Sequence, residues 1–362
     1  MSLIGQSKQA LDTPALWVDL DRLDSNIAEL AAYFKAAGVG WRPHMKGVKI
    51  PAIAHKAVNA GALGVTVAKL SEAEVMANNG IRDILIANQV VGPLKTGRLM
   101  QLRRQADVKV AVDDPANVAE LGAAARSAGV ELGILVDINT GMNRTGVASI
   151  EAAVALSQQV ADTPGLRYQG LMAWEGHAVG MQDAEAKEAS IRQSVSMLTD
   201  AADACRATGL PVEIVSGGGS GTYKFTAQIP GMTEIQAGGA IFNDAAYTRW
   251  GVTTQQALFV KVTVTSRPTP ERIIIDAGFK ALPGYHVQPE PLGVANIARY
   301  STSAEHGVIT LSAPNESLKV GDNLDVVVGY TDATLFLHDQ LYGIRDGVIE
   351  LIWPITARGK LT

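Results

Sequence analysis

The chain of 362 residues has one cysteine, few aromatic residues and no long apolar run. A single cysteine, Cys205, excludes an intrachain disulfide, and its apolar helical surroundings favour a small buried residue. No stretch approaches the roughly 18 consecutive apolar residues of a membrane span. The first residues also lack the charged, apolar and cleavable segments of a signal peptide. We therefore expect a cytoplasmic protein with no membrane partner.

Positive charge is also sparse. The formal net charge is −5, and the longest run of basic residues is the pair Arg103 and Arg104. A nucleic-acid-binding protein normally carries a basic stripe, so we expect no nucleic-acid partner. In contrast, 47% of the residues are hydrophobic, enough for a sizeable core. The length fits one large domain and a smaller one.

Short apolar runs alternate with alanine-rich helical stretches through the first two thirds of the chain. The predicted strands cover residues 40–42, 64–68, 83–87, 108–112, 131–137, 168–173, 213–216 and 234–237. The predicted helices between them include residues 50–59, 69–79, 93–105, 115–128, 150–161 and 184–207. Eight such units favour an α/β fold with a closed (β/α)8 barrel of the TIM type over an open doubly wound sheet.

After Trp250 the pattern changes to short β-rich segments separated by Gly, Pro, Asn and Asp. The predicted strands are residues 257–265, 272–276, 307–311, 324–328, 335–338, 340–345 and 348–353. A further strand, residues 15–20, precedes the barrel and is expected to join them. A helix from Asp21 to about Ala37 follows it, capped by Asp24 or Ser25. We thus predict a barrel domain of residues 25–250 and a mostly antiparallel β domain of residues 1–24 with 251–362.

Chemistry in this fold gathers at the carboxyl ends of the barrel strands. The first strand leads into Lys46, and burial there would lower the pKa of the amine and favour Schiff-base formation. The alternative is a solvated loop lysine, for which nearby Lys49 is better suited. The fifth strand leads into a glycine-flanked Arg144, which suits an anionic oxygen. The alternative is a surface arginine paired with Asp137.

The sixth strand ends in Trp174, Glu175, Gly176 and His177. A carboxylate, an imidazole and an indole at one strand end can all face a ligand, and a histidine serves as acid or base near neutral pH. For His177 alone, a hydrogen-bonded loop histidine is an equally good interpretation.

Two glycine-rich loops follow the seventh and eighth strands, at residues 216–222 and 237–240. Glycines let backbone N–H groups approach an anion, and these loops are the usual phosphate position of such barrels. A phosphate site, a first-strand lysine and an appended β domain together indicate a pyridoxal 5′-phosphate (PLP) enzyme, in which the cofactor supplies the electron sink.

The chain resembles the fold-type III PLP enzymes, specifically the D-threonine aldolase / D-serine dehydratase-like family, which is related to alanine racemases. The similarity spans nearly the whole chain. The motifs that carry it are TPALWVDLDRLDSNI, RPHMKGVK, LSEAEVMANNGIRDILIANQ, DINTGMNRTGV, SGGGSGTY, EIQAGGAIFNDAAY, IDAGFKAL, SAEHGVI and LIWPITARGK.

The resemblance implies roles for individual residues. Lys46 would hold the cofactor covalently, Arg144 would lie near its phenolic oxygen, and Asn88 would be a further cofactor-side residue. The motifs that resemble phosphate-binding ones contain Ser220, Gly221, Gly238, Gly239 and Tyr247. The resemblance also implies a homodimer with active sites shared between subunits, and a small amino-acid substrate.

The chain departs from the family pattern at two places. Family lyases usually bind a divalent metal through a His-x-Asp or His-x-Cys element, but here Tyr330 precedes Asp332 in that position. A neutral phenol is a poor ligand, so we expect the metal site to be weak or absent. At the sixth strand, Trp174 stands where the family often has tyrosine. Glu175 could then reach the ring nitrogen of the cofactor, and His177 could replace the family histidine as catalytic base.

Three functions follow from these residues. The first is a lyase acting on D-3-hydroxy amino acids, by retro-aldol cleavage or by dehydration, which the sequence does not separate. The second is an amino-acid racemase, with Tyr285 or Tyr330 as the second base. The third is a non-catalytic cofactor-binding protein, which the β domain argues against.

Overall fold

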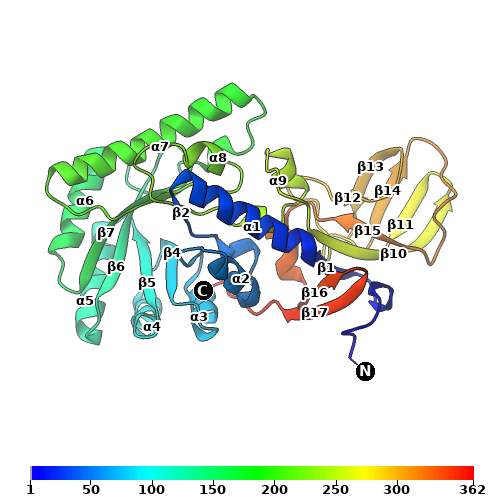
Figure 1. The fold of residues 1–362 in the computed structure, drawn as a ribbon, viewed down its shortest axis with the longest axis horizontal. Helices are drawn as coiled ribbons and strands as arrows, with labels where there is room; N and C mark the ends of the chain where they lie inside the picture. Colours follow the sequence, from blue (N-terminus) through cyan, green and yellow to red (C-terminus); the bar gives the residue numbers. More distant parts are fainter. Residues whose placement is uncertain (1) are drawn as a thin grey trace. The chain divides into compact units, whose positions relative to one another are not determined.

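The computed structural model describes residues 2–362, which form two compact units (Figure 1). The barrel unit comprises Leu30–Lys46, Pro51–Gly238 and Gly359–Thr362. The antiparallel unit comprises the residues up to Glu29 together with Gly47–Ile50 and Gly239–Arg358. The sequence-based domain limits at residues 24 and 250 stay a prediction; the compact units divide the chain close to both.

The barrel unit contains eight parallel strands in the order β2-β9-β8-β7-β6-β5-β4-β3. The strands are β2 (Gly40–Trp41), β3 (Val65–Val67), β4 (Asp83–Gln89), β5 (Asp107–Val112), β6 (Leu132–Ile138), β7 (Leu166–Ala173), β8 (Ile214–Gly217) and β9 (Glu234–Ile235). Backbone bonds from Leu63 to Trp41 and from Thr66 to Pro43, at 2.8 and 2.9 Å, link the β2 segment to β3. The predicted barrel is therefore confirmed over the open sheet.

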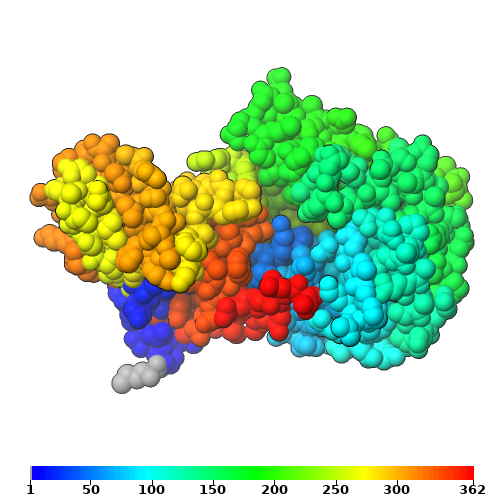
Figure 2. All heavy atoms as spheres, turned by 180° about the vertical axis from the view of Figure 1, so that it is seen from behind, coloured from blue at the N-terminus to red at the C-terminus, as the bar shows by residue number. Residues whose placement is uncertain are grey.

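Helices cover the strands on the outside. They are α2 (Pro51–Asn59), α3 (Leu70–Asn78), α4 (Pro93–Arg103), α5 (Pro115–Ala128), α6 (Ile150–Asp162), α7 (Ala184–Ala207) and the short α8 (Tyr223–Thr226). Every residue of β6 is buried, as expected for a parallel strand with both faces covered. In the space-filling view, the segments coloured cyan to green form one continuous outer surface (Figure 2). The carboxyl terminus lies beside α3, where Ser71 N–H donates to the Thr362 carbonyl at 2.8 Å.

Local sequence explains where these helices begin and end. Asp114 accepts from Ala116 N–H at 2.7 Å and caps α5, which ends at Gly129 with a left-handed φ of 64°. The first helix, α1 (Leu20–Ala37), begins earlier than expected, because Asp19 Oδ1 accepts from Arg22 N–H at 3.0 Å. The predicted caps Asp24 and Ser25 are therefore wrong, since both lie within the helix.

The antiparallel unit contains a sheet in the order β13-β14-β11-β10-β1-β16-β17, with β15 also paired to β10 and β12 to β15. Its strands are β1 (Ala15–Asp19), β10 (Leu258–Thr269), β11 (Arg272–Ile275), β12 (Glu290–Pro291), β13 (Ile297–Thr302), β14 (Gly307–Leu311), β15 (Asn323–Val327), β16 (Gln340–Arg345) and β17 (Val348–Pro354). As predicted, β1 joins this sheet, between β10 and β16. The Trp17 and Phe259 rings stack in its core with centroids 4.6 Å apart.

The prediction for this unit is wrong at residues 335–338 and misses two strands, the two-residue β12 and β13. Residues 335–338 were predicted as a strand, but Leu335–Leu337 forms a 3₁₀ turn because it continues directly from α10 (Thr331–Thr334). Strand β13 is missing from the prediction because its first half is exposed and gives no alternating apolar signal. The remaining helix, α9 (Ala245–Arg249), lies in the segment that leads into β10.

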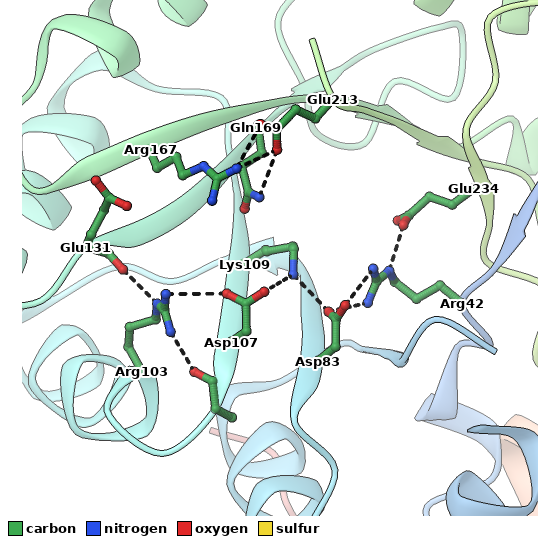
Figure 3. A network of polar contacts seen from close by, with 11 residues as sticks. Arg42, Asp83, Arg103, Asp107, Lys109, Glu131, Arg167, Gln169, Glu213 and Glu234 are labelled. Carbon is green, nitrogen blue, oxygen red and sulfur yellow. Dashed lines mark hydrogen bonds and ion pairs between the residues drawn. The ribbon is translucent and has the colours of Figure 1, made fainter. Parts of the chain in front are cut away.

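A chain of ion pairs lies near the amino ends of the barrel strands, opposite the end where this fold places its chemistry (Figure 3). Arg42 pairs with Asp83 at 2.6 Å and with Glu234 at 2.9 Å. Lys109 pairs with Asp83 and Asp107, both at 2.8 Å. Arg42 and Lys109 are only 2% and 3% exposed, so these charges are structural members of the barrel core.

Candidate active site

A small recess lies at the carboxyl ends of β6 and β7. Its lining residues are Asp137, Ile138, Asn139, Thr140, Met142, Arg144, Thr145 and Trp174. Arg144 is exposed and forms no ion pair within residues 2–362, so its guanidinium is available to an anion. The buried hydroxyl of Thr140 likewise has no hydrogen-bond partner in the described part of the chain. The recess thus offers a guanidinium cation to an anionic ligand.

Asp137 is a site residue that sequence reasoning treated only as a partner for Arg144. Its Oδ2 accepts instead from Thr145 Oγ1 at 2.8 Å and from Gln89 Nε2 at 3.1 Å. Burial raises the pKa of this carboxyl, although both hydrogen bonds oppose the shift. The signal in the sequence for this residue was a single carboxylate near the end of an otherwise apolar strand.

Lys46 lies in the 3₁₀ turn Met45–Gly47 that follows β2, and its backbone N–H faces His44 Nδ1 at 3.3 Å. The loop after β9 packs against this segment, because a Cβ on Gly238 would lie 2.0 Å from the His44 carbonyl oxygen. Only glycine fits there. Lys46 is an exposed residue, so the burial expected from the sequence is not observed.

The glycine-rich loop after β8 rests on the end of β7. A Cβ on Gly219 would lie 2.3 Å from the Trp174 ring, and Gly218 has a φ of 70° that favours glycine. Ser220 is buried within the loop, and the Gly221 N–H donates to no group within residues 2–362. The loop therefore presents backbone to its surroundings where side chains would block the approach of an anion.

Glu175 and His177 have different surroundings although they are two residues apart. Glu175 is 2% exposed, and its carboxylate binds Thr226 Oγ1 at 2.6 Å and Gly218 N–H at 3.3 Å. His177 is exposed, and its Nε2 lies 3.2 Å from Ser190 Oγ and 3.5 Å from Ser194 Oγ. The hydrogen-bonded loop histidine is thus observed, and a catalytic role for His177 stays a prediction.

The hydroxyl of Ser194 donates to the Thr140 carbonyl at 2.9 Å, so it can only accept from His177. Ser190 Oγ lies nearer to Nε2, at 3.2 Å, and its hydroxyl can either donate to that nitrogen or accept from it.

Asn88 lies in β4 and donates from Nδ2 to the Ala68 carbonyl at 2.9 Å, while its Oδ1 accepts from Gln89 N–H at 3.0 Å. These bonds fix the amide at the end of β3, and its contact with a cofactor stays a prediction.

In the antiparallel unit, Tyr247 packs on Gly239, where a Cβ would lie 2.1 Å from the ring. Tyr330 donates to Asp332 Oδ2 at 3.2 Å, and its ring is surrounded by those of Tyr247, Trp250, Tyr285 and His286. Burial raises the pKa of Tyr330, which therefore stays a neutral phenol.

The residues present do not fit a divalent metal at this position. Tyr330 is neutral and already donates to Asp332, which leaves one carboxylate as the only good ligand of the pair. Within residues 2–362, no three His, Cys, Asp or Glu side chains are grouped so as to hold a metal ion. His338 lies nearby in sequence but binds the Ala281 carbonyl at 2.8 Å.

The residues do fit a phosphorylated, anionic aldehyde in the barrel unit. An exposed lysine, a guanidinium without an ion pair and a glycine cradle are the groups that such a molecule requires.

Asp244 is fully buried between two short helices of the antiparallel unit and is a further residue that sequence reasoning missed. It accepts from Tyr247 N–H at 2.8 Å and from Thr331 N–H at 2.6 Å. Burial raises the pKa of Asp244 from 3.8 to about 7, against both hydrogen bonds.

This shift predicts a pH dependence of stability. Between pH 3.8 and about 7 the unfolded chain has released the Asp244 proton while the folded chain retains it, so the free energy of unfolding falls as pH rises. In Asp244→Asn this slope should be lost, and the variant should be less stable because an amide cannot accept from both N–H groups. Urea unfolding of both proteins across this range is the measurement; a parallel pH dependence in the two would contradict the assignment.

Comparison with known proteins agrees with the two units. The family model described as "Alanine racemase, N-terminal domain" matches residues 18–246, and "Putative serine dehydratase domain" matches residues 257–344. The chain is similar to 3-hydroxy-D-aspartate aldolase of Paracoccus denitrificans (strain Pd 1222), with 36% identity over 99% of this chain and 95% of the relative. It is 35% identical to D-threonine aldolase of Arthrobacter sp, over 98% and 95% of the two chains.

Among solved structures, D-threonine aldolase from Filomicrobium marinum matches with a TM-score of 0.97 and 36% identity over the whole of both chains. Solved structures of D-threo-3-hydroxyaspartate dehydratase match with TM-scores of 0.87–0.89 and 28–29% identity over 96–97% of this chain. The sequence matches to two further relatives cover less of the chain. D-threo-3-hydroxyaspartate dehydratase of Delftia sp. (strain HT23) is 34% identical over 75% of this chain and 73% of its own. Alanine racemase of Mycobacterium ulcerans is 32% identical over only 44% of this chain and 39% of its own.

Proposed function

The chain belongs to the PLP-dependent fold-type III family that contains the D-threonine and 3-hydroxy-D-aspartate aldolases, and from this premise we propose that it cleaves D-3-hydroxy-α-amino acids to glycine and an aldehyde. One observation carries the proposal: the aldolases match this chain over its whole length at 35–36% identity, above the 28–29% of the dehydratase structures that cover a similar length. The sequence similarity to alanine racemase of Mycobacterium ulcerans covers less than half of the chain, which disfavours the racemase alternative.

The barrel residues would hold the cofactor from several sides. Lys46 would bind its aldehyde carbon, Arg144 its phenolic oxygen and the Ser220–Gly221 turn its phosphate, with Gly238 and Asn88 nearby. Gly239 and Tyr247 are further candidates for the phosphate. Bound PLP supplies the electron sink that accepts the electron pair of the broken bond.

His177 is the proposed base for the substrate 3-hydroxyl proton. Its Nε2 faces the serine hydroxyls of α7, which leaves Nδ1 to accept the proton. The proton would then be held on an imidazolium whose Nε2–H donates to Ser190 Oγ, 3.2 Å away. This bond would fix the ring orientation during transfer.

We propose that the reaction proceeds without a divalent metal, because Tyr330 replaces the usual histidine and donates to Asp332. The homodimer and the cytoplasmic location also stay predictions. No helix within residues 2–362 combines the length and apolar character needed to cross a bilayer.

The test is product analysis with single substrates. D-Threonine should yield glycine and acetaldehyde, L-threonine should yield neither, and chelator treatment should leave the rate unchanged. A 2-oxo acid with ammonia would instead establish dehydration, and loss of optical rotation without cleavage would establish racemisation. Full loss of activity with chelator, restored by a divalent ion, would contradict the metal-free proposal.

A further inference from the structure

Glu175 binds the segment after β8 at two separate points. Its Oε2 accepts from Gly218 N–H at the start of the glycine-rich loop, and its Oε1 accepts from Thr226 Oγ1 at the end of α8. Thr226 is fully buried, and the 2.6 Å bond is short, as charge-assisted O–H···O bonds are. A carboxylate removed from water in this way is tolerated because these donors compensate for its lost hydration.

The loop between these two points is held by further contacts. Thr222 Oγ1 accepts from Gly219 N–H at 3.0 Å, and Thr226 N–H donates to the Thr222 carbonyl at 3.1 Å. Gly219 packs on the ring of Trp174, the residue before Glu175. The stretch between the fixed points contains Ser220 and Gly221, so its path is set by the end of β7.

We propose that Glu175 is a positioning residue that preorganises the Ser220–Gly221 turn for the phosphate of the cofactor, an inference that rests on the proposed function. Backbone N–H groups bind an anion best when they already point together before it arrives, because ordering a loop on binding lowers affinity. The carboxylate acts through the loop, in contrast to a direct contact with the ring nitrogen of the cofactor.

Comparing the binding of PLP with that of pyridoxal, which lacks the phosphate, distinguishes positioning of the Ser220–Gly221 turn from direct contact of Glu175 with the ring nitrogen. In a titration of the apoprotein, Glu175→Gln should weaken PLP binding by about tenfold or more, the range expected for loss of one charge-assisted hydrogen bond. Pyridoxal binding should change by less than about twofold on the same scale. The amide can still accept from Thr226, but its NH₂ group would face Gly218 N–H if that bond is kept.

Thr226 provides a second variant whose side chain is buried and already engaged. Thr226→Val should reproduce the selective loss of PLP affinity, and Thr226→Ser should restore it by returning the hydroxyl. Thr208→Val is the matched control, because Thr208 also donates to a neighbouring group, the Cys205 carbonyl, but lies at the end of α7. Its PLP affinity should equal that of the wild type.

Equal weakening of PLP and pyridoxal in Glu175→Gln, with a shifted absorption band of the bound chromophore, would overturn the proposal in favour of contact with the ring. Unchanged PLP affinity in both Glu175→Gln and Thr226→Val would overturn it as well. A wild-type protein that binds neither aldehyde would overturn the proposed function itself, and this inference with it.

Discussion

Replacing Lys46 with alanine is expected to abolish covalent capture of PLP and to lower lyase activity by at least about 10³-fold, because the amine that holds the cofactor in place is lost. The amine is the only group proposed to form a bond to the cofactor. It is exposed on the turn after β2, and Gly238 packs against the same segment. Added amines cannot replace a group held in place by the fold at comparable effective concentration.

The measurement is the absorption spectrum of reconstituted protein, followed by borohydride reduction and mass mapping of the modified peptide. Wild-type protein should show the absorption band of bound PLP near the edge of the visible range, and after reduction the cofactor should be found attached to Lys46. Lys49→Ala is the matched control, since it removes the same side chain three residues later, and it should keep both signals. If Lys46→Ala keeps the absorption band of bound PLP and another lysine is modified, that other lysine is the attachment site.

The sequence predicted the barrel well because its signals are local. Buried parallel strands such as β6 are continuous apolar runs. The start of α5 is indicated by its N-cap residue Asp114 and by Pro115 at its first position. The missed elements lacked such signals. Strand β13 is half exposed, and the turn at Leu335–Leu337 depends on the preceding helix, whose first N–H is bound by Asp244 from a distant part of the chain.

The same distinction applies to the candidate site. Motifs predicted Lys46 and Arg144, because each follows a strand whose end is readable from the sequence. The partners of Glu175 were not predictable, because Gly218 and Thr226 lie more than forty positions away and are brought to it only by the pairing of β7 with β8. A sequence pattern specifies which side chains reach the rim, but tertiary packing decides what each one contacts there.

The second large effect is a loss of stability on removing Arg42 from the ion pairs near the amino ends of the barrel strands. Arg42→Ala should lower the free energy of unfolding by about 3–5 kcal/mol, the cost of removing one partner from a buried ion pair. Glu234 Oε2 would then lose its Arg42 partner, while its Oε1 already has no hydrogen-bond partner within residues 2–362. Asp83 would keep only Lys109. The buried carboxylate of Glu234 and the partly buried one of Asp83 would therefore be undercompensated (Figure 3).

Denaturant unfolding followed by circular dichroism measures this effect, with Arg167→Ala as the matched control. Arg167 also pairs with a carboxylate, Glu213, but both side chains are about half exposed, so its removal should cost less than about 1 kcal/mol.

The difference in the free energy of unfolding between wild type and Arg42→Ala should also become smaller at acid pH. Burial raises the pKa of Asp83, but the bonds and charges of Arg42 and Lys109 outweigh it and hold the pKa below 3.8. The stability from this pairing is present above pH 3.8 and is lost as pH falls through the lowered pKa. Equal destabilisation by Arg42→Ala and Arg167→Ala at neutral pH would show that the buried network does not stabilise the barrel.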